Sequence, residues 1–189
     1  MRQALTLFSL LLLAGCGSSP KTNFYTLSVP PATTGHHSIS SPVQLAAVHM
    51  PPSLDRVKMI RMTNPNTVQI SETDRWSAPL DEMVRNVLSQ DLAAILPTNK
   101  VILPRAPAPV GTGTLVVTLT QFGPDASGEV KLKGSWALLN SASGQTQLER
   151  NFELDAGPAA DADATAAAMS KALSRLASII SAGLSKTGI

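Results

Sequence analysis

The chain has 189 residues, which is enough for one globular domain or two small ones. Hydrophobic residues make up 43% of it and charged residues 15%, a composition too apolar for a disordered chain. Fifteen basic and 13 acidic residues leave a net charge of +2, which argues against a nucleic-acid-binding domain. The single cysteine excludes an intramolecular disulfide and a cysteine-based zinc site.

The amino-terminal segment has the pattern of an export signal. A positively charged start is followed by an apolar run from Ala4 to Ala14. A run of about eleven residues is too short to cross a bilayer as a helix, but it fits the apolar region of a secretory signal. The run ends in Leu13-Ala14-Gly15-Cys16, which resembles the lipobox of bacterial lipoproteins.

That resemblance implies that Cys16 is acylated and that the signal is cleaved before it. If Cys16 were incidental, an exported chain would carry a free thiol, which is a redox liability. We therefore expect a signal peptide at 1–15, an acylated tether at 16–22 and a periplasmic domain at 23–189. Gly17, rather than Asp, follows the cysteine. By resemblance to lipoprotein sorting in enterobacteria, this favours the outer membrane.

The first part of the domain has strand patterns. Alternation and flanking proline pairs predict strands at Asn23–Val29 and Val43–His49. Lys58–Thr63 and Thr67–Ser71 are expected to form a hairpin around the Asn64-Pro65-Asn66 turn.

An amphipathic helix is expected next. Ser77 is predicted to cap it, Pro79 is tolerated in its first turn, and Pro97 ends it. Its apolar residues recur at steps of three and four and form one continuous face. They are Leu80, Met83, Val84, Val87, Leu88, Leu92, Ile95 and Leu96.

The second half predicts strands followed by a helix. Val101–Leu103 reads as a short strand, and Thr114–Phe122 as a central one because it is apolar on both faces. Glu129–Leu139 and Gln145–Leu154 alternate as an antiparallel meander with one polar face. A helix at about 163–185, capped by Asp161 or Asp163, has an apolar face of Met169, Ala172, Leu173, Leu176, Ile179, Ile180, Gly183 and Leu184. The fold class is therefore α+β: a single domain with a mainly antiparallel sheet and two amphipathic helices packed on one face.

The sequence gives little sign of catalytic chemistry. His36, His37 and His49 lack the spacing of a metal site, and Asp161 and Asp163 read as helix caps. The sequence contains no nucleophile elbow and no phosphate-binding glycine loop. We expect no enzyme activity, no cofactor and no metal.

Two clusters have a structural and a functional interpretation. Arg56, Lys58 and Arg61 form either a solvated strand face or a contact for anionic head groups or an acidic partner. Arg75-Trp76, just before the first helix, either fastens the helix entry to the sheet or contacts a ligand. The structural interpretation is favoured for both.

Several landmarks occur in a recognisable order. Asn23-Phe24-Tyr25-Thr26-Leu27 follows the lipobox, Leu54-Asp55-Arg56 follows a proline pair, and Arg75-Trp76-Ser77-Ala78-Pro79-Leu80 opens the helix. Together they resemble the ABC-type transport auxiliary lipoproteins, which include the paraquat-inducible protein C group (PqiC, also called YmbA). The resemblance covers most of residues 16–103, and the second half matches in order and length.

The resemblance implies a non-catalytic lipoprotein of the outer membrane that faces the periplasm. Its partner would be an MCE-domain protein of the inner membrane, in a system that moves lipids between the membranes. We hypothesise that it docks this partner and that copies form a ring. Two alternatives stay open: a carrier that binds one lipid itself, and a tether for another envelope complex. A carrier needs a sizeable apolar cavity.

Overall fold

The structure, a computed structural model, describes residues 20–30 and 37–186, so the expected signal peptide and Cys16 lie outside the described residues. Two sheets and two helices make up the domain. The larger sheet has the strand order β5-β2-β6-β7-β8. Its strands are β2 (Val43–His49), β5 (Val101–Ile102), β6 (Gly113–Pro124), β7 (Glu129–Leu139) and β8 (Thr146–Pro158).

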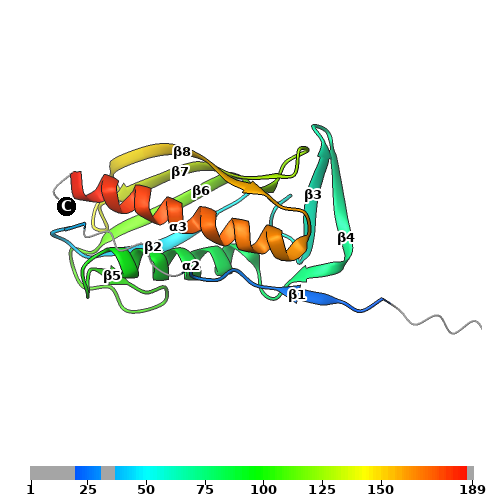
Figure 1. Ribbon diagram of the computed structural model, residues 1–189. Coiled ribbons are helices and arrows are strands. Elements are labelled where there is room, and N and C mark those ends of the chain that lie inside the picture. The colour runs from blue at the N-terminus through cyan, green and yellow to red at the C-terminus, as the bar shows by residue number, and fades with distance from the viewer. Residues whose placement is uncertain (1–19, 31–36, 187–189) are drawn as a thin grey trace, which may run out of the picture.

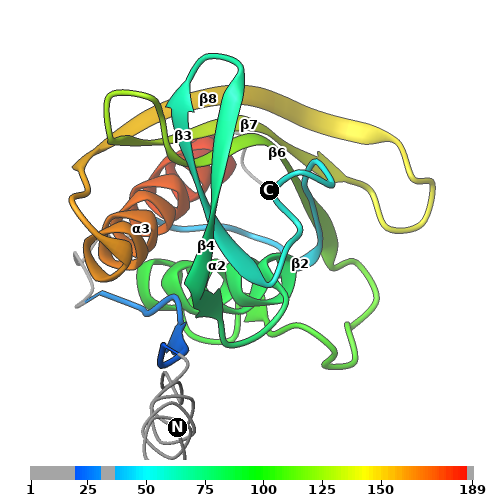
Figure 2. The same cartoon turned by 90° about the vertical axis from the view of Figure 1, so that its right-hand side faces the viewer.

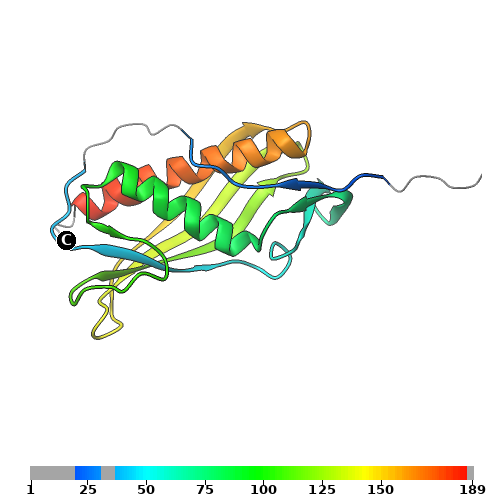
Figure 3. The same ribbon diagram turned by 90° about the horizontal axis from the view of Figure 1, so that it is seen from below.

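Both helices, α2 (Leu80–Ile95) and α3 (Ala162–Lys186), lie across the same face of the larger sheet (Figures 1 and 3). This confirms an α+β domain with two helices on one face. β6 is central, as predicted. Its outward residues Thr118 and Thr120 are exposed, because both helices pack against the other face. Among the described residues, no helix has both the length and the apolar character needed to cross a membrane.

The core lies between the helices and the sheet. Every apolar residue predicted on the face of α2 is buried, and so are the inward residues of β7. On α3 the exception is Ile179, which is 39% exposed because it lies at the border of the apolar face. Gly183 is only half-buried, but it packs closely on the core: a Cβ there would lie 2.6 Å from the Trp136 ring. The glycine thus lets α3 approach the sheet.

The larger sheet is mixed, whereas the sequence indicated mainly antiparallel pairing. β6, β7 and β8 form the expected antiparallel meander. β2, however, pairs in parallel with both β5 and β6. Parallel neighbours need a crossover connection, and α2 lies in the connection that follows β2. Residue alternation within a strand does not reveal the direction of its neighbours, so the sequence pattern missed this pairing.

A separate three-stranded sheet has the order β1-β4-β3, with β1 (Asn23–Tyr25), β3 (Lys58–Asn64) and β4 (Thr67–Trp76). β3 and β4 form the predicted hairpin. The first strand is shorter than the expected Asn23–Val29. Beyond Tyr25 the chain turns to α3 instead, where the backbone N–H of Ser28 donates to Ser170 Oγ (3.0 Å) and Leu27 is buried.

The two helices begin differently. Ser77 was expected to cap α2, but the cap position is Pro79 and no side chain caps the helix. The fixed φ of Pro79 and the acidic residues Asp81 and Glu82 in the first turn suit this start. At α3, Asp161 acts as the cap, because its Oδ1 accepts a hydrogen bond from the Ala164 N–H (2.8 Å).

One carboxyl group lies on the buried face of α2. Asp91 is 3% exposed, and its Oδ2 has no hydrogen-bond partner among the described residues. Burial raises the pKa of Asp91 from 3.8 to about 6. The ionised form is therefore less favourable in the folded chain than in the unfolded one. The protonated Asp91 carboxyl favours the folded state relative to the ionised one. This contribution to stability is fully present below pH 3.8 and is lost as the pH rises through about 6.

We predict that Asp91→Asn stabilises the protein at pH 7.5 by about 1–3 kcal/mol and changes it little at pH 4, because the substitution removes a buried charge that exists only at the higher pH. Urea unfolding at the two pH values measures this difference. Asp163→Asn is the matched control. Asp163 is exposed in the first turn of α3, where loss of the charge is slightly destabilising. An Asp91→Asn protein no more stable than the parent at pH 7.5 would contradict the prediction.

Candidate docking site

The hairpin β3–β4, called the arm from here on, stands at one end of the domain (Figures 1 and 2). The end of α3 lies at the opposite end (Figure 1). β1 pairs in parallel with the base of the arm, with Asn23 opposite Asp74 and Tyr25 opposite Trp76. The first described residues and the base of the arm are therefore held together.

Asp74 joins β1 to the arm. Its Oδ1 accepts hydrogen bonds from Asn23 Nδ2 (3.1 Å) and the Tyr25 hydroxyl (3.3 Å). Its Oδ2 accepts one from Ser71 Oγ (2.8 Å), and Ser71 Oγ in turn accepts from the Asp74 backbone N–H (2.9 Å). β4 bulges between its paired positions Ile70 and Arg75, because β3 has fewer residues in the matching stretch. Ser71 and Asp74 lie in this bulge, and the hydrogen bond between them closes it.

The same contacts set the charge state of the network. Hydrogen bonds from Asn23, Ser71 and Tyr25 hold the pKa of the Asp74 carboxyl below its usual value, against an opposing effect of burial. The pKa of Tyr25 is raised by burial and by the nearby Asp74 carboxylate. Asp74 is therefore ionised and Tyr25 neutral at pH 7, which is the combination that the hydrogen bond needs.

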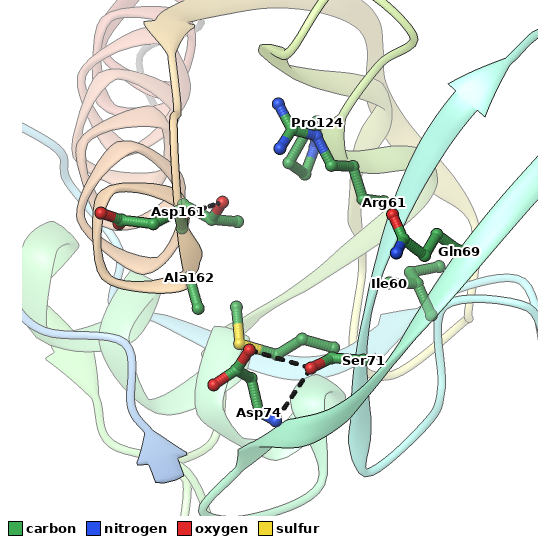
Figure 4. Close-up of a pocket in the computed structure, with 10 residues that line it drawn as sticks. Ile60, Arg61, Gln69, Ser71, Asp74, Pro124, Asp161 and Ala162 are labelled. Carbon is green, nitrogen blue, oxygen red and sulfur yellow. Dashed lines mark hydrogen bonds between the residues drawn. The ribbon is translucent and has the colours of Figure 1, made fainter.

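A pocket of about 260 Å³ opens between the arm and the start of α3 (Figure 4). Arg61, Ser71 and Asp74 line it from the arm, and Asp161 from α3. Arg61 Nη2 donates to the backbone carbonyl of Ala159 (3.3 Å). This mixture of one cation and two carboxylates suits a polar side chain of a partner protein. The volume is smaller than that of typical small-molecule sites.

Trp76 has the structural role that the sequence favoured. Its side chain is 5% exposed and lines a small hollow with Leu80 and Phe122. Its backbone N–H donates to the Val57 carbonyl (2.7 Å). The indole therefore fastens the arm and the entry of α2 to the sheet.

The basic residues predicted as a group have separate surroundings. Lys58 Nζ pairs with Glu72 (3.1 Å), Arg61 lines the pocket, and Arg56 is exposed. Of the histidines, His36 lies outside the described residues and His49 is exposed. Within residues 20–30 and 37–186, no three His, Cys, Asp or Glu side chains are grouped to hold a metal ion.

The sequence did not identify Asp74 or Ser71 as site residues. The partners of Asp74 on β1 lie 49 and 51 residues earlier in the chain, so no local spacing connects them. The available signal was the short Ser71-Glu72-Thr73-Asp74 run, whose polar residues interrupt the strand pattern.

A helix-covered sheet with a small mixed-charge pocket and a projecting arm defines a domain of the α+β class. The chain belongs to the family of ABC-type transport auxiliary lipoprotein components, whose model matches residues 25–181. This confirms the resemblance seen in the sequence. The family is named for an auxiliary role in transport rather than for catalysis.

Similar proteins are found in both sequence and structure. The chain is 32% identical over 162 residues to "Intermembrane transport lipoprotein PqiC" of Escherichia coli K12, which covers 82% of each chain, and the match to the Shigella flexneri protein of the same name has the same values. The crystal structure of protein XCC0632 from Xanthomonas campestris has a TM-score of 0.73 at 17% identity and covers 88% of this chain and 97% of that one. An uncharacterized protein has a TM-score of 0.62 at 23% identity, over 89% and 99%. The structural matches show a shared fold.

We predict that Asp74→Ala loosens β1 without unfolding the domain, because the Asn23 and Tyr25 side chains lose a charged acceptor while the helix-covered core is untouched. Amide hydrogen exchange in residues 23–25 should become about tenfold faster, the factor expected for losing ~1.5 kcal/mol of hydrogen bonding to a charged group. Asp55→Ala, at an exposed carboxylate in the loop before β3, is the control and should leave exchange in β1 unchanged. Equal protection of β1 in both variants would show that Asp74 does not hold it.

Proposed function

We propose that this chain is an outer-membrane-anchored lipoprotein of an MCE-type system that moves lipids between the two membranes, and that it is a non-catalytic docking module. Residues 1–15 are the signal peptide, and Cys16 carries the acyl chains. Residues 16–22 form the tether, and the domain starting at residue 23 faces the periplasm. The observation that carries the proposal is family membership, together with the similarity to a protein named an intermembrane transport lipoprotein.

The geometry favours docking over carrying a lipid. The space between the helices and the larger sheet is filled by side chains under 2% exposed, among them Trp136, Leu88 and Leu173. The pocket beside the arm, at about 260 Å³, suits a side chain better than a phospholipid with its acyl chains. A module of this kind acts through its surface.

The proposed partner is an MCE-domain protein of the inner membrane, and we further propose that copies of the chain form a ring around it. A symmetric partner is matched most simply by a symmetric assembly. β1 lies at the edge of the three-stranded sheet, where strand addition between neighbours is geometrically simple. Its three residues make that pairing shorter than the sequence indicated.

For the anchor, Cys16→Ser should abolish acylation and leave an uncleaved or mislocalised precursor, because Cys16 is the only thiol in the chain. Labelling of cells with radioactive palmitate, followed by membrane fractionation, measures both effects. Ser19→Ala, in the proposed tether, is the control and should be labelled like the parent. Equal label on the Cys16→Ser protein would refute the lipoprotein assignment.

For the partner, Arg61→Ala should weaken binding of the MCE protein about tenfold, the loss expected for an arginine at an interface centre. Arg56→Ala is the matched control, because Arg56 is exposed in the same basic segment but does not line the pocket. Affinity of the purified proteins by interferometry compares the variants. A parent chain that binds no MCE protein would move the assignment to the tether of another envelope complex.

A further inference from the structure

One face of the three-stranded sheet carries exposed apolar side chains. Along β3, Met59 is buried and Arg61 reaches the Ala159 carbonyl, so both point toward the body of the domain. Side chains alternate along a strand, so Lys58, Ile60 and Met62 project to the opposite face of the small sheet. At β3 this face still borders the domain, because Ile60 and Met62 line a small hollow with Gln121 and Phe122 of β6.

Strand pairing extends this face across the sheet, because directly paired residues project to the same side. Lys58 pairs with Arg75, and Arg75 with Phe24. The next residues along these two strands point inward: Tyr25, after Phe24, is half-buried, and Trp76, after Arg75, is buried. The next two rows are Ile60 with Ile70 and Met62 with Val68. These seven residues, Phe24, Lys58, Ile60, Met62, Val68, Ile70 and Arg75, are called the outer face.

The outer face is apolar along the arm and basic at its base. Phe24 is 65% exposed, Val68 47% and Ile70 41%, whereas Ile60 and Met62 are half covered. Residues 62–71 contain no charged side chain. At the base, Arg75 and Lys58 stand beside Phe24, and Glu72 neutralises one of these two cations through its pairing with Lys58 (3.1 Å).

This face lies at the end from which the tether leaves. Figure 2 looks onto that end, where the arm crosses in front of the body and β1 lies at its base. Six residues lie between Cys16 and Asn23, and the seven residue steps from one to the other span at most about 25 Å when the chain is fully extended. An anchor at Cys16 therefore keeps the outer face close to the membrane surface.

We propose that the outer face rests on the surface of the phospholipid bilayer that holds the anchor, an inference that depends on the proposed acylation of Cys16. Phe24, Val68 and Ile70 enter the boundary between head groups and acyl chains, where aromatic and aliphatic side chains are stabilised. Arg75 and Lys58 meet the lipid phosphates. Three exposed apolar side chains bind a bilayer weakly on their own. The tether makes the contact intramolecular, so a weak contact is enough to orient the domain.

The test uses the full-length chain, purified in its acylated form and reconstituted into vesicles of phosphatidylethanolamine and phosphatidylglycerol. A cysteine introduced as Ile70→Cys carries an environment-sensitive fluorophore, and Cys16 is blocked by its acyl chain. Ala142→Cys, in the exposed β7–β8 turn at the opposite end of the domain, is the control (Figure 3). Lipids with a quencher near the head group should remove most of the fluorescence at position 70 and little at position 142.

A second variant keeps the result interpretable. Adding Phe24→Ser and Val68→Ser to the labelled protein should reduce quenching at position 70 while the circular dichroism spectrum stays unchanged, because both side chains are exposed. If the chain floats with the vesicles but position 70 is quenched no more than position 142, the bilayer contact is refuted and the anchor stands. Cross-linking of position 70 to another copy or to a protein partner in that case would assign the face to them. If the chain does not float with the vesicles and the fluorophore reacts with Cys16, both the anchor and the bilayer contact are refuted.

Discussion

Burial of a single face of the larger sheet beneath α2 and α3 is the constraint on which the rest of the molecule depends. Leu88, Leu173 and Trp136 fill the layer between them, and Gly183 lets α3 come close enough to close it. Close packing of this kind leaves the interior without room for a transported lipid. The surfaces left for recognition are the open face of the sheet and the ends of the domain, and the arm stands at one of these ends.

The arm depends on the core for its position but contributes little to it. Met59 and Trp76 are its buried apolar side chains, and both lie near its base. Farther out, the hairpin is held by its own strand pairing and by the Arg61 contact with Ala159. Side chains toward its tip are consequently free to change without disturbing the fold, which is the usual arrangement of a recognition element on a rigid scaffold.

Local patterns predicted the elements well and their long-range arrangement poorly. Periodicity identified the apolar residues of the buried face of α2, and alternation identified the inward residues of β7, because both signals lie within one element. The parallel pairing of β2, the early end of β1 at Tyr25 and the missing Ser77 cap depend on contacts with distant parts of the chain. The candidate site shows the same limit: Asp74 meets side chains from a strand about 50 residues earlier, and no spacing rule reaches that far. The family was recognisable because its signals are short sequence motifs.

The parallel pairing of β1 with β4 also determines how the domain responds to mechanical force. A pull on the chain ahead of β1 reaches the domain first at Asn23, where the side-chain amide is held by Asp74. The force then passes along a ladder of three residues to Trp76, which is embedded in the core. Beyond Tyr25, the Ser28 contact with Ser170 carries the load to α3. Under such a pull, β1 is expected to yield before the helix-covered layer behind it, because only three paired residues hold it to the arm.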